Sequence, residues 1–394
     1  MSVQPNRMPL QAQVNGAGPT GALAALALAE AGWGVQLRDP LDRAALLQRS
    51  RAYAFTHSSR RLLERLSLWS ALEPLLVPFT QLQLCDLALD PEAAAGLPFT
   101  PHDLPRSERT TAAAVGWIGL HAPLLEVLLA RLQAHPAVQL LLGDDPAAPA
   151  ASPAVDLLVA ADGSASPTRQ AHGIGVWRLP YRQACLTARV ELEGSAPHQA
   201  WELLRPEGPF ALLPLGGPQV QVVWSAPRER CRRREEAGGA ALLDALASAL
   251  PDRFRPHTLT DTPRAFPVEL LLAHRLQKGS LVLVGESAHR CHPVGGQGLN
   301  LCWRDVAVLH RLAGRAALGQ LPVGRLPAAY ARRRWLDVVA TLVITDLLVR
   351  LYSNRSRLLL PPRRLALALL RRSAALRRLL LSQMTNGACL PERA

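Results

Sequence analysis

The sequence is poor in lysine and in aromatic residues, and both scarcities bear on the partners to be expected. Lys278 is the single lysine, so the formal net charge of +13 on this 394-residue chain comes from arginine and partly reflects a composition bias. Aromatic residues make up 5% of the chain and are not interleaved with the arginine clusters. Stacking on single-stranded nucleic acid is therefore disfavoured, and we expect no nucleic-acid partner.

Paired cysteines, a signal peptide and a membrane-spanning segment are also lacking. The six cysteines form no C-x-x-C pair and no closely spaced framework: Cys85, Cys185, Cys231, Cys291, Cys302 and Cys389. Such usage is typical of a reducing compartment. The start MSVQPNRMPL has no apolar signal core, and no uninterrupted apolar run is long enough to span a bilayer. We expect a cytoplasmic protein whose membrane contact is peripheral, on the inner face.

Hydrophobic residues, by contrast, form 49% of the chain, which excludes disorder and fills one large or two modest cores. The positive charge is concentrated near the end, where residues 330–394 hold 13 arginines against three acidic residues. A basic tail on a near-neutral body favours a surface partner such as anionic lipid.

The pattern of apolar residues changes along the chain. Residues 10–39 predict a strand, a glycine turn, an apolar helix and a second strand. Residues 51–142 are predicted to be mostly helical, because apolar residues recur at three- to four-residue spacing in RRLLERLSLW and PLLEVLLARL. Alternation between residues 175 and 267 predicts antiparallel strands, flanked by the buried-strand patterns DLLVAA and SLVLVGE. We therefore expect two domains built from discontinuous sequence.

A glycine-rich turn follows the first predicted strand. Gly16, Gly18 and Gly21 form G-x-G-x-x-G, in which they would permit a tight turn, the approach of a pyrophosphate and helix–strand contact, respectively. The helix N-terminus would hold the phosphates, and Asp39, at the end of the next strand, is placed to accept from ribose hydroxyls. This turn predicts dinucleotide binding and leaves NAD and FAD both open.

Three further stretches carry a family resemblance: RAYAFTHSSRRLLERLSLW, ADGSASPTR and LVGESAHRCHPVGGQGLNLCWRDVAVL. With the glycine turn, they resemble the group A flavin monooxygenases of the para-hydroxybenzoate hydroxylase fold. Within these, the chain is most similar to the ubiquinone-biosynthesis hydroxylases of the 2-octaprenyl-6-methoxyphenol hydroxylase type. The resemblance covers nearly the whole chain, including GPFALLPL in the middle and YARRRWLDVVATLVITDLLVRLYSN near the end.

The resemblance implies an α/β (α+β) fold. A Rossmann-like FAD-binding domain is expected over residues 8–174 and 268–325, with helical insertions within 51–142. An antiparallel-sheet substrate domain over residues 175–267 interrupts it, and a basic helical C-terminal region over residues 326–394 follows.

The resemblance also implies a cofactor site for FAD, with NAD(P)H as a transient reductant. The matching positions are Gly16, Gly18, Gly21, Asp39, Arg51, Asp162, Gly163, Gly285, Glu286, Pro293, Gly295, Gly296, Gly298, Leu299 and Asn300, with Ser166 and Arg169 at the usual spacing. The turn GGQGLNL opens a helix, whose dipole would stabilise negative charge on a reduced flavin.

Three positions depart from the family pattern. Glu286 replaces an aspartate, Asp39 stands where glutamate is usual, and His121 lies where a charged or amide residue is general. These departures motivate a non-catalytic flavin-fold membrane scaffold as one alternative function.

The main expectation is hydroxylation of the aromatic ring of a prenylated phenol or quinone precursor by O2, through a flavin C4a-hydroperoxide. Because the flavin carries the chemistry, no protein acid or base is predicted. A soluble-substrate aromatic hydroxylase or epoxidase on the same fold is the second alternative. Partner proteins of a quinone-biosynthesis complex are compatible with this assignment.

Two other patterns concern metal and membrane. The spacing of His289, Cys291 and His292 matches no zinc pattern, so no metal site is expected. The segment PPRRLALALLRRSAALRRLLLS predicts a helix with arginines on one face and leucines on another: Arg364, Arg371 and Arg378 against Leu365, Leu369, Leu376 and Leu380. Such a helix either packs on its own domain or lies in a membrane interface.

Overall fold

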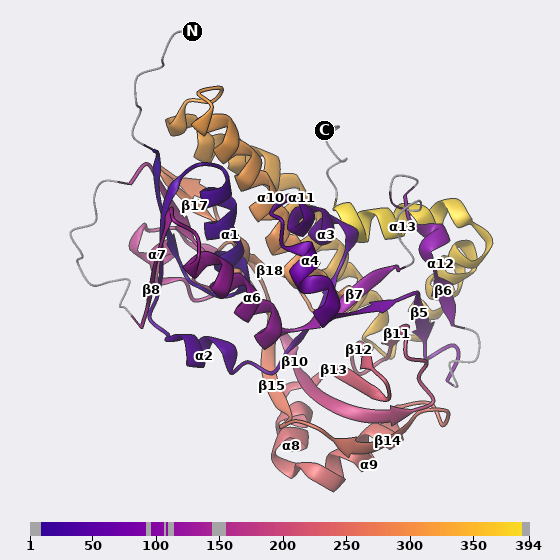
Figure 1. The fold of residues 1–394 in the computed structure, drawn as a ribbon. Coiled ribbons are helices and arrows are strands. Elements are labelled where there is room, and N and C mark those ends of the chain that lie inside the picture. The colour runs from indigo at the N-terminus through magenta and orange to yellow at the C-terminus, as the bar shows by residue number, and fades with distance from the viewer. Residues whose placement is uncertain (1–8, 92–95, 106–107, 109–113, 144–154, 388–394) are drawn as a thin grey trace.

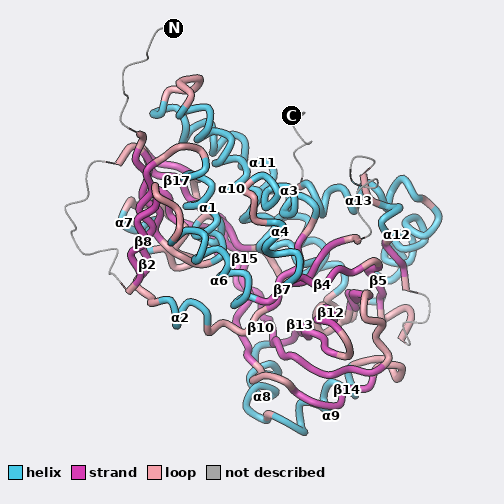
Figure 2. Tube along the Cα trace, viewed as in Figure 1, coloured by secondary structure: helices cyan, strands magenta, loops and turns pink. Residues whose placement is uncertain are grey.

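A computed structural model of the chain describes residues 9–91, 96–105, 108, 114–143 and 155–387. Within these residues the strands form three sheets, of six, nine and three strands. Figure 1 shows the first sheet at one end of the molecule and the largest sheet at the other, and Figure 2 shows the long C-terminal helices running alongside both. This mixed α/β architecture confirms the predicted fold class.

The six-stranded sheet has the order β16-β17-β9-β1-β2-β8, and all of its neighbouring strands are parallel except β16 and β17. Its strands are β1 (Gln11–Asn15), β2 (Gly34–Asp39), β8 (Val138–Leu142), β9 (Leu157–Ala160), β16 (Gln277–Lys278) and β17 (Leu281–Leu283). The last two follow the antiparallel region in sequence; β17 pairs with β9, and β16 pairs with β17 at the edge of the sheet. The sheet is therefore built from discontinuous sequence.

Strand β1 is unusually polar for a central strand. Its polar side chains form a buried chain of hydrogen bonds, in which Gln13 Nε2 donates to Asn15 Oδ1 at 2.9 Å and Asn15 Nδ2 donates to Thr168 Oγ1 at 3.0 Å. A buried polar group is tolerated when it is paired. The polar sequence thus ties β1 to α7 (Pro167–Ala171) without breaking the sheet.

Helix α1 (Pro19–Glu30) is alanine- and leucine-rich on every side because it is enclosed on every side. It packs against the six-stranded sheet, α6 (His121–Gln133) and α10 (Gln297–Ala317). Trp33, just beyond it, donates its indole N–H to the Ala313 carbonyl oxygen at 3.1 Å. Small side chains allow these elements to approach closely, as the sequence predicted. The short α2 (Arg43–Leu47) follows β2.

The nine-stranded sheet is mostly antiparallel, with the order β18-β15-β10-β13-β12-β11-β5-β6 and β14 paired to β10. Its strands are β5 (Gln81–Asp86), β6 (Leu97–Phe99), β10 (Val176–Glu193), β11 (Gln199–Leu204), β12 (Phe210–Gly216), β13 (Gln219–Pro227), β14 (Arg255–Leu259), β15 (Arg264–Ala273) and β18 (His289–Arg290). Helices α8 (Arg228–Ala237) and α9 (Gly239–Ala249) bury apolar side chains against one face, among them Leu242 and Leu246.

The prediction that residues 51–142 are mostly helical is wrong in part. Helices α3 (His57–Arg65), α4 (Trp69–Leu72) and α6 are present, but β3 (Ala52–Phe55), β4 (Leu76–Phe79) and β7 (Gly116–Leu120) form the three-stranded sheet, and β5 and β6 join the nine-stranded sheet. These strands are short and pair with distant partners, as β5 does with β11. The sequence of β5, QLQLCD, does alternate, whereas β4 (LVPF) and β6 (LPF) are too short to show a repeat.

The C-terminal region consists of α11 (Leu326–Tyr352), α12 (Leu360–Arg372) and α13 (Ala374–Asn386). The prediction of one continuous tail helix is wrong, because Ser373 is extended (φ −115°, ψ 104°) and caps α13 by accepting from Leu376 N. Arg377 Nη1 donates to the Leu370 and Arg371 carbonyl oxygens and so fixes the break. Within the described residues, no helix is long and apolar enough to cross a bilayer.

Short 3-10 turns link these elements. They are Glu73–Leu75, Pro101–Asp103, Gly285–Ser287, Val294–Gly296, Val323–Arg325 and Arg357–Leu359. Two of them, Gly285–Ser287 and Val294–Gly296, lie within the third predicted motif.

Candidate functional site

The predicted site residues fall into two adjoining groups. One group lies at the carboxyl ends of the neighbouring parallel strands β17, β9, β1 and β2, where open α/β sheets bind their ligands: Gly16, Gly18, Gly21, Asp39, Asp162, Gly163 and Gly285. The other group lines a cavity of about 790 Å³ between the nine-stranded sheet and the C-terminal helices: Arg51, Glu286, Pro293, Gly295, Gly296, Gly298, Leu299 and Asn300.

The glycines of the turn between β1 and α1 have two different roles, one in the fold and one in ligand binding. Gly16 has φ +102°, and a Cβ there would meet the backbone of Ala161, while a Cβ at Gly21 would overlap the Gly16 carbonyl oxygen. Gly18 has φ −64°, and a Cβ there would meet nothing within 4 Å. Gly16 and Gly21 are therefore required by the fold, whereas Gly18 borders open space at the N-terminus of α1. That space is where a pyrophosphate would lie.

Asp39 is 7% exposed, and both of its carboxylate oxygens accept backbone hydrogen bonds. Oδ2 accepts from Ala17 N at 2.6 Å and Oδ1 from Leu41 N at 2.9 Å. The shorter aspartate thus holds the glycine turn against the end of β2. Each oxygen keeps a second lone pair, which a ribose hydroxyl can use.

The D-G motif after β9 carries an unpaired polar atom. Asp162 Oδ2 accepts from Thr168 N at 3.0 Å, but Asp162 Oδ1 is buried without a partner in the described structure. Ser166 caps the following helix by accepting from Arg169 N. Arg169 donates to the Ser287 carbonyl oxygen at 2.8 Å and so links this motif to the segment that carries Glu286. A buried acceptor without a donor is where a ligand hydroxyl fits.

A buried charge network supports the segment that begins at Gly285. Asp305 Oδ2 accepts from Gly285 N at 2.8 Å and lies 2.7 Å from His289 Nε2, while Asp305 Oδ1 accepts from Arg334 Nε at 2.6 Å. Arg334 also donates to Asp337 Oδ2 at 2.6 Å. Burial alone would raise the pKa of Asp305, but His289 and Arg334 outweigh it and lower that pKa to about 2. The network joins α10 and α11 to the site.

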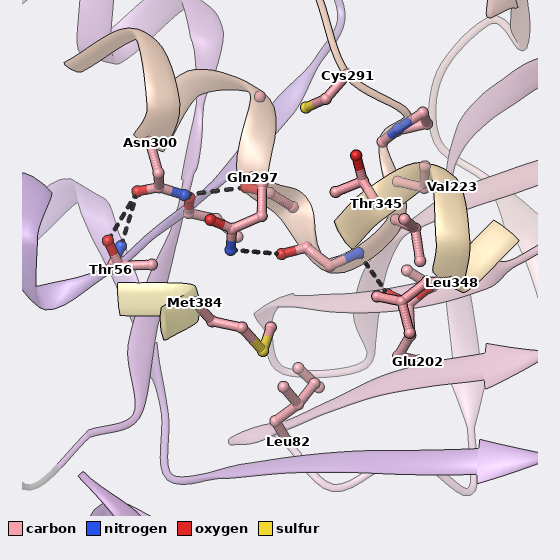
Figure 3. Close-up of a pocket in the computed structure, with 18 of the residues that line it drawn as sticks. Thr56, Leu82, Glu202, Val223, Cys291, Gln297, Asn300, Thr345, Leu348 and Met384 are labelled. Carbon is pink, nitrogen blue, oxygen red and sulfur yellow. Dashed lines mark hydrogen bonds between the residues drawn. The ribbon is translucent and has the colours of Figure 1, made fainter. Parts of the chain in front are cut away.

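The glycine-rich loop before α10 is held in a left-handed conformation, with φ +69° at Gly295 and +62° at Gly296. Asn300 fixes it from behind: its Nδ2 donates to the Ala54 and Gly296 carbonyl oxygens, and its Oδ1 accepts from Thr56 N (Figure 3). Asn300 is therefore a positioning residue for the loop.

Arg51 and Glu286 are the predicted charged residues of the cavity. Arg51 lies over the Phe266 ring, with the guanidinium carbon 4.4 Å from the ring centroid. The Glu286 side chain is 44% exposed and its carboxylate is 3.9 Å from Arg290 Nε. The carboxylate remains accessible, so the longer side chain at this position does not bury its acid.

His121 lies away from the cavity lining. It is 1% exposed, its Nε2 lies 2.8 Å from the Leu46 carbonyl oxygen, and its Nδ1 lies 2.9 Å from Tyr53 Oη. Burial lowers the pKa of His121 and raises that of Tyr53 to about 12. The unusual histidine is thus neutral and anchors α6 to β3.

The predicted absence of a metal site concerns His289, Cys291 and His292, which serve different purposes. His289 belongs to the Asp305 network, and His292 Nε2 lies 3.2 Å from Gln183 Oε1. Burial raises the pKa of the Cys291 thiol to about 12, so that no thiolate forms near neutral pH. Among the residues that the structure describes, no group of three or more metal-ligating side chains is gathered.

Among the cavity residues that sequence reasoning missed is Glu202 on β11. Its Oε2 accepts from Gly295 N at 3.4 Å (Figure 3), and burial raises its pKa to about 7. The available signal was a lone carboxylate in the apolar strand sequence QAWELL. It also missed the contribution of α11, α12 and α13 to the cavity wall.

The sequence is similar to known protein families and to individual proteins. A family model described as an FAD binding domain matches residues 154–339. Ubiquinone hydroxylase UbiL of Rhodospirillum rubrum is 33% identical and is aligned over 92% of this chain and 86% of its own. This chain belongs to the FAD-dependent hydroxylases of ubiquinone biosynthesis. It is accordingly an oxidoreductase with FAD as its cofactor.

A further relative and a structural neighbour are also similar to this chain. The 3-demethoxyubiquinol 3-hydroxylase of Escherichia coli is 28% identical over 76% of this chain and 78% of its own. Klebsiella pneumoniae HpxO, solved in complex with FAD and uric acid, has the same fold at a TM-score of 0.73 and 18% identity, covering 96% of this chain and 97% of its own. The second likeness concerns the fold alone.

The residues of this hydroxylase fit an FAD molecule. The open space at Gly18, the unpaired Asp162 Oδ1 and the accessible Glu286 carboxylate follow one another from the glycine turn to the cavity. The Gly295–Gly296 loop lines the cavity itself.

Proposed function

We propose that this protein hydroxylates the aromatic ring of a prenylated phenol or quinone precursor, with FAD as cofactor, O2 as oxidant and NAD(P)H as transient reductant. The observation that carries the proposal is the apolar cavity, which extends from the glycine-rich loop to leucines on the outer helices. The proposed domains are those stated above: FAD binding over residues 8–174 and 268–325, substrate binding over 175–267 and a basic helical region over 326–394.

Bound FAD would supply the reducing electrons that activate O2. Gly16, Gly18, Gly21 and Asp39 would hold its adenosine and pyrophosphate, with Arg51 near the phosphates. Asp162, Gly163, Gly285 and Glu286 would hold the ribityl chain. Pro293, Gly295, Gly296, Gly298, Leu299 and Asn300 would line the ring, whose negative charge the N-terminus of α10 stabilises.

The cavity wall favours an apolar substrate over a soluble aromatic acid. Charged side chains, Arg51, Glu202, Glu286 and Arg290 among them, gather near the glycine-rich loop. The part that the C-terminal helices enclose is lined by side chains such as Ile344, Leu351, Leu369, Leu370, Leu376, Leu379 and Leu380. Among the described residues that line that part, there is no arginine or lysine to bind a carboxylate. A hydrocarbon tail there is stabilised by about 25 cal/mol for each Å² removed from water.

The same helices carry unpartnered leucines on their outer surface. Leu358 is 87% exposed and Leu365 is 60% exposed, and Leu347, Leu369 and Leu379 are also exposed. Some of these residues line the cavity as well, which makes the outer helices a direct route between the cavity and a surrounding lipid phase. Exposed arginines lie on α12 and α13 as well: Arg364 and Arg371 on α12, and Arg378 on α13. We therefore propose peripheral contact of α12 and α13 with an anionic membrane surface, as would befit a component of a quinone-biosynthesis complex.

Changing Arg364, Arg371 and Arg378 together to glutamine is expected to lower partitioning onto anionic vesicles by about two orders of magnitude at modest salt. Each arginine contributes about 1 kcal/mol near such a surface. Raising the ionic strength of the parent protein should have a similar effect, because the attraction is screened within about 10 Å at 0.1 M. Co-sedimentation with vesicles measures both effects.

The matched control removes the same charge from α8, where Arg230, Arg232 and Arg233 are exposed on a helix that lies apart from α12 and α13 (Figure 1). Changing these three to glutamine should leave vesicle binding near that of the parent. Equal loss in both triple variants would mean that net charge alone, and no particular surface, governs the binding.

Turnover of two substrates tests the function itself. The FAD-loaded protein is expected to transfer one atom of labelled O2 into a short-tailed 2-prenylphenol, detected by mass spectrometry, and to leave 4-hydroxybenzoate unchanged. With a long-tailed substrate in vesicles, the α12–α13 triple variant should lose turnover while keeping it on the short-tailed one. Hydroxylation of 4-hydroxybenzoate in preference to the prenylphenol would favour the soluble-substrate alternative. Bound FAD without any product would favour the scaffold.

A further inference from the structure

Glu202 is the half-buried acid of the cavity wall that faces the proposed flavin loop. It lies on β11, in the sheet that forms the floor of the cavity, and its carboxylate is directed at Gly295 (Figure 3). The other labelled side chains near it in this view are Val223, Thr345 and Leu348, which are apolar or carry a single hydroxyl. On the side of these three residues, the carboxylate therefore faces mostly hydrocarbon.

The carboxylate has no cationic partner in the described structure. Its only hydrogen bond there is the long one from Gly295 N at 3.4 Å. The nearby cations of the cavity are occupied elsewhere: Arg51 lies over Phe266, and Arg290 is placed between Glu269 and Glu286. An unpaired carboxylate in an apolar site is costly unless a ligand donates a proton or a hydrogen bond to it. The structure thus leaves one acceptor position in the cavity for a ligand to fill.

We propose that Glu202 is a catalytic residue that accepts the hydrogen bond of the substrate's phenolic hydroxyl and takes its proton. The proposal rests on the proposed function, since it requires an aromatic hydroxyl beside the Gly295–Gly296 loop. It adds to that function a protein group that acts on the substrate.

The step is a simple proton transfer. The phenol O–H bond breaks, the proton bonds to a Glu202 carboxylate oxygen, and the electron pair stays on the phenol oxygen as a phenolate. A phenolate is more electron-rich at its ring carbons than a phenol and reacts faster with an electrophilic oxygen. The proton returns to the product oxygen before release, which restores the carboxylate.

The acidity of Glu202 suits this role. Burial raises its pKa to about 7, which lies closer to the value of about 10 typical of a phenol than an exposed glutamate does. A base whose pKa is near the working pH combines a useful ionised fraction with a useful proton affinity. An exposed glutamate would be ionised but too weak a base.

Binding to the oxidised, FAD-loaded protein gives the first test. The affinity for 2-geranylphenol is expected to rise by about tenfold or more as the pH increases through about 7, because a charged acceptor strengthens the hydrogen bond. The methyl ether of the same compound, which has no proton to donate, should show no such rise. In the Glu202→Gln variant both curves should be flat. A rise that is the same for the ether, or that persists in the variant, would overturn the proposal.

Single turnover gives the second test and avoids the unidentified electron donor. The flavin is reduced with dithionite and mixed with O2 and 2-geranylphenol. Glu202→Gln should lower the rate of hydroxylated product formation by about a hundredfold, with hydrogen peroxide formed instead. A fluorinated, more acidic phenol should restore product in the variant while changing the parent little. Equal rates in parent and variant, or no rescue, would contradict a proton-accepting role.

Two controls distinguish a wrong role for Glu202 from a wrong proposed function. Glu193→Gln makes the same chemical change on β10 of the same sheet, at an exposed side chain outside the cavity, and should behave as the parent. A parent protein that makes no product from any phenol refutes the proposed function, whereas a productive parent matched by Glu202→Gln refutes only the role of Glu202. Should the variant lose FAD, the comparison of phenol with methyl ether on unaltered protein still decides.

Discussion

Gly18→Val is expected to raise the dissociation constant for FAD by about a hundredfold or more while leaving the apoprotein folded. Gly18 has an ordinary negative φ, and a Cβ there meets nothing within 4 Å, so the backbone accepts a side chain. Loss of the helix cap costs about 1 kcal/mol at most. The valine would instead occupy the space of the pyrophosphate, and an overlap of about 3 kcal/mol corresponds to about that change in affinity.

Gly21→Ala is the matched control, because it adds a smaller group to the same turn with the opposite consequence. The new Cβ would overlap the Gly16 carbonyl oxygen, so α1 must move away from β1 and the protein should lose about 3 kcal/mol of unfolding free energy. Flavin fluorescence titration and urea unfolding of the apoprotein measure the two quantities. If Gly18→Val destabilises the apoprotein as much as Gly21→Ala does, Gly18 serves the backbone and the pyrophosphate assignment is wrong.

Asp305→Asn is expected to lower the unfolding free energy by about 3–5 kcal/mol. The change leaves the buried Arg334 guanidinium beside a neutral amide, and breaking one partner of a buried ion pair has this order of cost. It also weakens the hold on Gly285 N, so FAD retention should fall with stability. Glu64→Gln, which breaks the partly exposed pair with Arg60, should cost less than about 1 kcal/mol.

Asp305 is also expected to contribute to the fall in unfolding free energy at acidic pH. Folding lowers the pKa of Asp305 from 3.8 to about 2, so its ionised form favours the native state. Its contribution is complete above pH about 4 and is lost as the pH falls through about 2. Asp305→Asn should therefore flatten the dependence of unfolding free energy on pH between these values. An unchanged acid limb would show that other carboxylates determine it.

The sequence by itself was sufficient for the features whose signals are local. The glycine turn, the apolar run of α1 and the repeated apolar spacing in α3 and α6 each depend on residues within one or two turns of chain, and the structure has all of them. The family motifs are also contiguous, which is why FAD and the fold class followed from them. The polar residues of β1 are explained in part by Thr168, which accepts a hydrogen bond from Asn15 and lies in the motif ADGSASPTR.

Tertiary structure decided the features that depend on distant partners. Strands β4, β6 and β7 are too short to show a repeat and become strands through pairing with other segments, whereas the alternating sequence QLQLCD of β5 did carry a strand signal. The tail is divided at Ser373 because Arg377 donates to the end of α12 and also to Asp103, which lies 274 residues earlier in the sequence. Glu202 is an ordinary glutamate in QAWELL until burial and Gly295 surround it. Burial, charge pairing and the course of a cavity arise only when separate segments meet, and no single stretch of sequence contains them.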